Sequence, residues 1–106
     1  MNKKYIYSAL LALLACSSAQ GIESIVGKVK TLEASYMPSY ITFTLDTGSA
    51  ACPASKWLVW KSVDKDNNKA VYASLLAALS TNKTIRFHYA DGDVNCNGVY
   101  IHFLDF

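Results

Sequence analysis

Apolar and polar residues alternate along most of the chain after Ile22, and residues typical of turns divide this pattern into short segments. A period of two is typical of β-strands that have one face on the core and the other in solvent. In the clearest segment, Ile41, Phe43 and Leu45 are expected to face the core. The strands predicted in this way are Ile25–Leu32, Tyr40–Leu45, Trp57–Lys61, Thr84–Tyr89 and Val99–Phe103.

The alternation also assigns faces in the last two predicted strands. Side chains at every second position of a strand share one face of the sheet. The residues expected on the core-facing side are Ile85, Phe87 and Tyr89 and, in the same phase, Val99, Ile101 and Phe103. The residues expected on the opposite side are Arg86, His88, Tyr100 and His102.

The period changes once, between the third and fourth predicted strands. Val71, Leu75 and Leu79 are spaced by four residues, which predicts a helix from Asn68 to Leu79. Asn82 is expected to end this helix in a left-handed conformation. An N-cap side chain accepts a hydrogen bond from a free backbone N–H, and the candidates for this position are Asp66, Asn67 and Asn68.

Three strands, one helix and two strands thus follow one another in a single domain, residues 20–106. This order matches the five-stranded oligonucleotide/oligosaccharide-binding barrel (OB-fold), which belongs to the small all-β barrels. Closing the sheet would cover its edges, and the helix is placed to plug one end. We therefore expect a mainly β fold with one helix, organised as an OB-fold-like barrel.

The first residues have the layout of a secretory signal. Lys3 and Lys4 precede an apolar run that is too short to cross a bilayer, which takes about 20 apolar residues as a helix. Cleavage after Ala19 would remove residues 1–19 as a signal peptide and leave a secreted or periplasmic protein. The alternative is a lipoprotein leader, residues 1–15, with acylation of Cys16; only this route would place the protein on the outer membrane.

Charge balance argues against nucleic acid as a partner. Once Lys3 and Lys4 leave with the leader, eight basic and eight acidic side chains remain. Binding to phosphates requires a dense basic stripe, and the remaining Lys and Arg residues form no such cluster along the sequence.

Two cysteines remain in the mature chain, Cys52 and Cys96. In an oxidising compartment they are expected to form one disulfide, which in the chain-entropy model stabilises the fold by roughly 4 kcal/mol. A domain of this size is marginally stable without such help. Neither cysteine lies in a Cys-x-x-Cys motif, so a metal site is not predicted from them.

The segment Phe43–Ala50, FTLDTGSA, fits the pattern that aspartic proteases have around a catalytic aspartate. That chemistry needs two carboxylates, so Asp46 could act only in a dimer. The predicted helix takes the place of the hairpin flap that such enzymes carry, and the chain ends on a strand. The alternative is that Asp46 and Gly48 form a turn after a strand.

Two further patterns suggest metal sites but are incomplete. Asp93–Gly98 matches the first half of a calcium-binding loop, yet Leu104 stands where a bidentate Glu is required. His88 and His102 are expected on outward strand faces, where polar surface residues are the commoner interpretation. The sequence therefore predicts neither a bound metal nor a cofactor.

Several aromatic residues are expected on the outer surface of the barrel. Aromatic rings there can stack on sugar rings while neighbouring polar groups bind the hydroxyls, although such rings can equally cover the core or form a subunit contact. The candidate ligand-binding residues are Tyr36, Tyr40, Trp57 and Tyr100.

Four short segments carry a resemblance to a known family: Ala51–Pro53, Trp57–Trp60, Lys69–Tyr72 and Thr81–Phe87. Across roughly residues 40 to 103 the chain resembles the B subunits of the subtilase-cytotoxin type and similar small secreted proteins of Gram-negative bacteria. The resemblance implies an OB-fold, a pentameric ring and binding of sialylated glycans on host cells. The N-terminal serine motif of the family's sugar pocket has no match here.

These observations lead to three hypotheses of function. The first is a non-catalytic secreted or periplasmic binding module, glycan-binding and pentameric as the resemblance implies. The second is a structural or interaction protein of the envelope, which acylation of Cys16 would favour. The third, ranked last, is a dimeric aspartic protease that uses Asp46.

Overall fold

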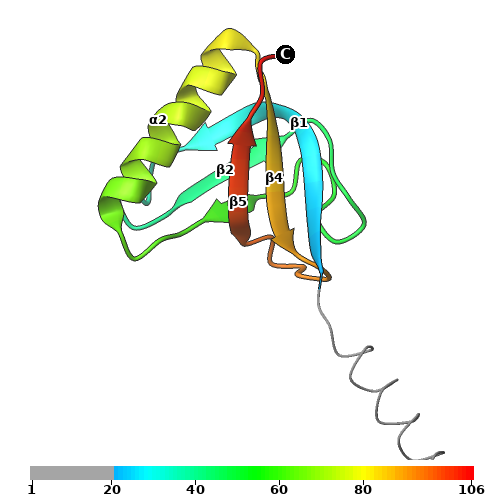
Figure 1. The fold of residues 1–106 in the computed structure, drawn as a ribbon. Coiled ribbons are helices and arrows are strands. Elements are labelled where there is room, and N and C mark those ends of the chain that lie inside the picture. Colours follow the sequence, from blue (N-terminus) through cyan, green and yellow to red (C-terminus); the bar gives the residue numbers. More distant parts are fainter. Residues whose placement is uncertain (1–20) are drawn as a thin grey trace, which may run out of the picture.

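The computed structural model of this chain describes residues 21–106, so the predicted leader and Cys16 lie outside the described residues. The described part contains five strands and one helix in the predicted order, and the mainly β class with one helix is confirmed (Figure 1). The elements are β1 (Ile22–Glu33), β2 (Ile41–Leu45), β3 (Leu58–Trp60), α2 (Lys65–Thr81), β4 (Thr84–Ala90) and β5 (Gly98–Phe103).

The strands form one antiparallel sheet with the order β3-β2-β1-β4-β5. The central strand β1 pairs with β4 along its first half, from Ile22 to Lys28, and with β2 along its second half, from Val29 to Glu33. The register shifts between Val29 and Thr31. Because such a bulge bends a strand, β1 curves from one part of the sheet into the other, as Figure 1 shows.

The five strands form one sheet as expected, but the sheet is not closed into a barrel. The expectation of a closed five-stranded barrel is therefore wrong. One parallel bridge, Val59 to Asn97, joins β3 to the residue before β5, and the Val59 N–H donates to the Cys96 carbonyl at 3.0 Å. β3 contains only three residues, and this single bridge precedes the first residue of β5. The edge of β5 that faces away from β4 therefore stays unpaired.

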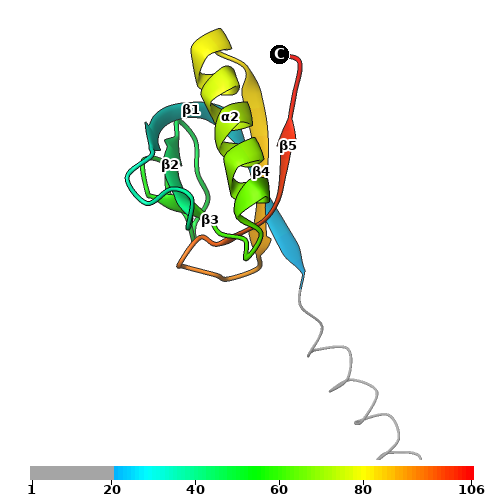
Figure 2. The same ribbon diagram turned by 90° about the vertical axis from the view of Figure 1, so that its left-hand side faces the viewer.

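The inner face of the sheet follows the predicted alternation. Ile85, Phe87 and Tyr89 are fully buried on β4, and Ile41 and Phe43 are fully buried on β2. α2 packs against β1 and lies beside the curled sheet, where it adds Leu75 and Ala78 to the same core (Figure 2). Among residues 21–106, no helix has the length and apolar character needed to cross a membrane.

Tyr100 and His102, predicted on the outer face of β5, are exposed, but on its core-facing side the prediction holds only at Ile101, which packs against the core. Val99 and Phe103, predicted on the same face, are 40% and 43% exposed. β5 is an edge strand of the sheet, so it has a paired neighbour strand on one side only. Sequence alternation gives the phase of a strand, whereas burial depends on how many neighbours the strand has.

α2 begins earlier than predicted. Its N-cap is Asp64, whose carboxylate accepts hydrogen bonds from the backbone N–H groups of Asp66 and Asn67, so the three residues proposed for the cap lie inside the helix. The prediction for Asn82 is confirmed: it is the C-cap, with φ 56° and ψ 37°. Leu79, placed on the apolar stripe by its spacing, is exposed, and Ala78 is buried instead.

Asn68 is a fully buried polar side chain that joins three segments. Its amide Nδ2 donates to the carbonyls of Pro38 at 2.9 Å, Ser39 at 3.1 Å and Ser62 at 3.0 Å, and its Oδ1 accepts from the Ser62 N–H at 3.0 Å. These bonds fix the loop between β1 and β2 against the start of α2. They therefore also fix the position of Tyr36 and Tyr40, which flank that part of the loop.

Candidate functional site: an exposed tyrosine pair

The four aromatic residues predicted to bind ligand lie in three separate places, because only Tyr36 and Tyr40 come together. Tyr36 is in the loop between β1 and β2, and Tyr40 is the residue before β2. Trp57, 45% exposed, directly precedes β3, and Tyr100, 53% exposed, is in the middle of β5. In the described chain, ring contacts join Tyr36 to Tyr40 and Tyr100 to His88, whereas Trp57 takes part in none of these pairs.

Tyr36 and Tyr40 form a stacked pair, with ring centroids 4.7 Å apart and an angle of 10° between the planes. Tyr36 is 45% exposed, so part of its ring remains open to solvent. The Lys61 ammonium lies 5.8 Å from the centre of the Tyr40 ring, within the range of a cation–π contact. The pair thus offers an apolar ring next to a group that can donate hydrogen bonds.

On the outer face of β4 and β5, His88 contacts both Tyr100 and His102. The His88 Nε2 and His102 Nδ1 atoms are 3.3 Å apart. The pKa of His88 is lowered below its ordinary value, first by partial burial and then by the charges of His102 and Arg86. His88 therefore takes up a proton at a lower pH than an ordinary histidine side chain does.

The loop after β2 explains the protease-like pattern in structural terms. The Asp46 carboxylate accepts a hydrogen bond from the Lys28 N–H at 2.8 Å, and the Thr47 hydroxyl donates to the Val26 carbonyl at 2.6 Å. Both side chains press on Gly27, where an added Cβ would lie 2.3 Å from Thr47 Oγ1. Asp46 and Thr47 thus satisfy the backbone of β1, and Gly27 provides the space for them.

A chain of hydrogen bonds links this loop to the buried Tyr89. The Tyr89 hydroxyl donates its one proton to Glu23 Oε2 at 2.5 Å. The hydrogen bond between Tyr89 and Ser49 therefore has the Ser49 hydroxyl as its donor. Ser49 Oγ also accepts from the Cys52 N–H at 3.1 Å. Burial, and then the bond to Glu23, raises the pKa of Tyr89, while the bond from Ser49 opposes this in part.

The predicted disulfide between Cys52 and Cys96 is present, with both residues fully buried. It joins the loop after β2 to the loop before β5. The second loop is fixed again by Lys56, whose ammonium donates to the Val94 carbonyl. A disulfide of this kind is consistent with an extracytoplasmic location.

The carboxylate of Asp93, the first residue of the calcium-like segment, is hydrogen-bonded within its own loop. Its carboxylate accepts from the backbone N–H groups of Asn95 at 2.9 Å and Asn97 at 3.1 Å. Burial alone would raise the pKa of Asp93, but these bonds to Asn97 and Asn95 outweigh it and lower the pKa. In residues 21–106, no three His, Cys, Asp or Glu side chains are grouped as metal ligands.

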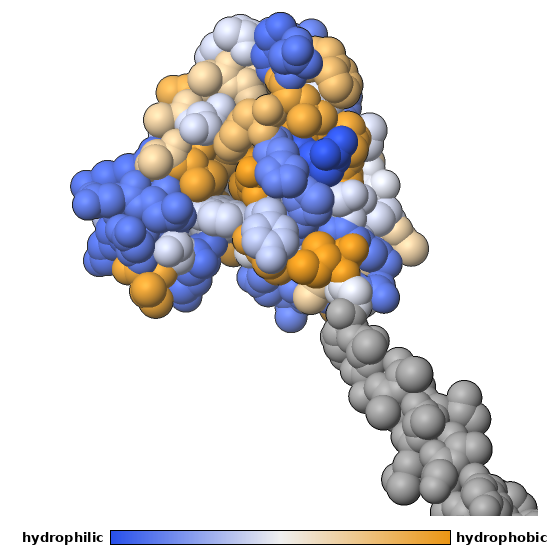
Figure 3. All heavy atoms as spheres, in the orientation of Figure 1, coloured by the Kyte–Doolittle hydropathy of each residue, from blue (hydrophilic) through white to orange (hydrophobic). Residues whose placement is uncertain are grey.

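A groove with a volume of about 320 Å³ runs between α2 and the end of β5. Figure 3 shows apolar atoms gathered on this side of the molecule. Its floor and walls come from both elements and the segments that follow them, and the lining residues are Ser74, Ala77, Ala78, Thr81, Lys83, Phe103 and Leu104.

Sequence reasoning missed two parts of these sites. Lys61 is predicted only as the end of a strand, and no local pattern places its ammonium near the Tyr40 ring. The hydrogen bonds that link Tyr89 with Glu23 and with Ser49 join residues 66 and 40 positions apart, and no local pattern signals them.

In comparisons with known proteins, no protein-family model, no curated protein and no solved structure matches this chain. The functional argument therefore depends on the geometry just described.

Proposed function

We propose that this chain is a non-catalytic binding module of an extracytoplasmic compartment, and that its ligand is a carbohydrate. The observation that supports this most is the stacked Tyr36–Tyr40 pair: the Tyr36 ring is partly open to solvent, and the Lys61 ammonium lies 5.8 Å from the centre of the Tyr40 ring. A sugar ring has an apolar face of C–H groups that packs on an aromatic ring. Its hydroxyls accept hydrogen bonds from an ammonium group such as that of Lys61.

The binding surface is held in place before any ligand arrives. Asn68 fixes the loop that carries Tyr36 through the carbonyls of Pro38 and Ser39. A preorganised site loses less conformational freedom on binding, which raises affinity without further contacts. The proposal therefore assigns binding to Tyr36 and Tyr40 rather than to Trp57 or Tyr100.

We further propose that the fold is an OB-fold-like barrel that is incompletely closed. The order of the strands, the position of α2 between β3 and β4, and the parallel bridge from Val59 to Asn97 support this assignment. By resemblance, the proposal extends to a secreted protein that forms a pentamer. The predicted signal peptide and the disulfide support secretion.

The test is a glycan array with the purified mature protein, followed by measurement of the affinity for each sugar that gives a binding signal on the array. Tyr36→Ala is expected to reduce the affinity at least tenfold, and the matched control Tyr100→Ala, another exposed tyrosine at a separate place, is expected to leave it unchanged. Absence of any sugar signal from the wild-type protein would remove carbohydrate as the ligand class. A solution mass measurement on the same sample shows whether the protein is a pentamer.

A second candidate function is a structural or interaction protein of the envelope. The exposed β5 supports it, because its residues Gly98–Phe103 include none of the Lys or Pro residues that usually protect a sheet edge. An extended segment of a partner could add to this edge and place side chains in the neighbouring groove. The intact mass of the processed protein distinguishes an acylated Cys16, which favours this candidate, from a free N-terminus at Gln20.

A further inference from the structure

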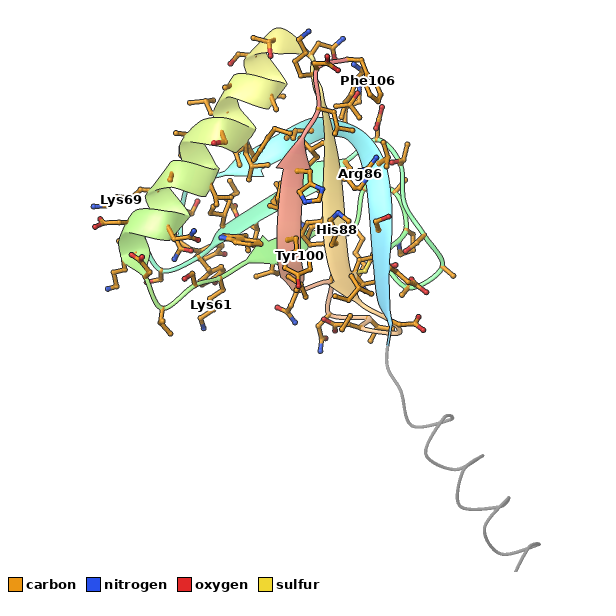
Figure 4. The ribbon with its side chains drawn as sticks, viewed as in Figure 1. Lys61, Lys69, Arg86, His88, Tyr100 and Phe106 are labelled. Carbon is orange, nitrogen blue, oxygen red and sulfur yellow. A yellow bond between two sulfur atoms is a disulfide. The ribbon has the colours of Figure 1, made fainter. Side chains whose placement is uncertain are left out.

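We propose that His88 and His102 together form a binding site for one divalent transition-metal ion, such as Zn²⁺ or Cu²⁺, on the outer face of β4 and β5. The two histidines are neighbours across the sheet, because His88 is opposite Tyr100 and His102 is opposite Arg86 in the ladder. In Figure 4, His88, Arg86 and Tyr100 lie close together along these two strands. The site is separate from the tyrosine pair proposed to bind sugar.

The spacing of the ring nitrogens is the main argument for the site. His88 Nε2 and His102 Nδ1 are 3.3 Å apart. Two imidazole nitrogens that bind one tetrahedral Zn²⁺ at about 2.05 Å are about 3.3 to 3.4 Å apart, as bond length and tetrahedral angle require. The metal-free protein therefore already has the separation that a chelating pair needs.

Metal binding at this position needs no change in the backbone and no loss of a proton from the pair. Without metal, one ring N–H points at the nitrogen of the other ring. When the proton moves to the second nitrogen of the same ring, both facing nitrogens carry lone pairs and can bind the ion. The ladder between β4 and β5 fixes the two backbones, so little order is lost on binding.

The surroundings define what kind of site this is. His102 and Tyr100 are exposed and His88 is half-buried, so an ion bound by both imidazoles keeps open positions toward solvent. The charge of Arg86 repels a cation but can hold an anionic group that binds to those open positions. Imidazole nitrogen favours Cu²⁺ over Zn²⁺ and Ni²⁺, so Cu²⁺ is expected to bind most tightly.

The experiment uses the mature, tag-free protein with its disulfide intact, titrated calorimetrically with ZnCl₂ and CuCl₂. The chain has two histidines, so variants can address every imidazole in the protein. We expect one ion per chain, and an affinity at least tenfold lower in both His88→Gln and His102→Gln. The double variant is expected to have a metal affinity only slightly lower than that of either single variant, since one remaining imidazole cannot chelate the ion.

Two results would overturn the proposal: wild-type affinity in the double variant, or single variants that keep wild-type affinity with half the number of ions. The first would mean that other groups bind the metal, and the second that the imidazoles act separately. A control on the same face, Arg86→Gln, is expected to bind metal at least as tightly as the wild type. Tyr100→His places a third imidazole directly opposite His88, and we expect it to tighten binding at least tenfold.

Discussion

Asn68 provides the most direct test of how the loop that carries the tyrosine pair is held. Replacing it by alanine removes four hydrogen bonds and leaves the Ser62 N–H and the carbonyls of Pro38, Ser39 and Ser62 without their partner. Each buried polar group that loses its partner costs about 1 to 3 kcal/mol. Ser39 is exposed, so its carbonyl can bind water, and the other groups are half-buried at most. We expect Asn68→Ala to lower the free energy of unfolding by about 3 kcal/mol.

Guanidinium unfolding, followed by tryptophan fluorescence, measures this loss. With an m-value of about 2.5 kcal/mol per molar, the midpoint is expected to fall by about 1.2 M. The matched control is Asn67→Ala, the same chemical change one residue earlier, where an exposed Oδ1 accepts a single bond from the Trp60 ring N–H. A loss below about 1 kcal/mol, or a loss equal to that of Asn67→Ala, would refute the assignment of Asn68 as the residue that holds the loop.

Three further predictions concern stability. Replacing both Cys52 and Cys96 by alanine opens a loop with a sequence separation of 44 and is expected to cost about 4 kcal/mol, measured by the same unfolding experiment. At the C-cap, with φ 56°, Asn82→Val is expected to cost about 1 to 2 kcal/mol, whereas Asn82→Gly should change stability by less than about 0.5 kcal/mol; equal effects would contradict the left-handed cap. The lowered pKa of His88 means that the unfolded chain takes up this proton at a higher pH than the folded protein. Stability should therefore decrease as the pH falls through about 6.5, and His88→Gln should show a smaller decrease between pH 7.5 and 5.5 in thermal unfolding.

The sequence was sufficient to predict the order of the elements and the disulfide. β4 has Ile85, Phe87 and Tyr89 fully buried on its inner face and polar residues on its outer face. A period-two pattern predicts a strand reliably when one face is buried in this way. The disulfide was predicted from a count, since only one pair of cysteines lies beyond the predicted leader. These predictions needed only local or compositional information.

Closure of the sheet and the identity of the site could not be predicted in the same way. Whether β3 and β5 form a ladder depends on how sharply β1 bends at its bulge, a property of the whole sheet. Exposure was predicted correctly for Tyr36 and Tyr100, but the sequence does not show that only the first has a stacked tyrosine beside it. Likewise, Asn68 was proposed as a cap because its type favours caps, although its side chain turns inward to the loop carbonyls.

The bond between Cys52 and Cys96 also divides the chain into a covalent ring and two tails. The ring contains β3, α2 and β4, whereas β1, β2 and β5 belong to the tails. A pull on the two ends of the protein is transmitted through the sulfur atoms and cannot stretch the ring. Such a force would draw out the tails first, and because β1 lies between β2 and β4, its departure would divide the sheet at its centre.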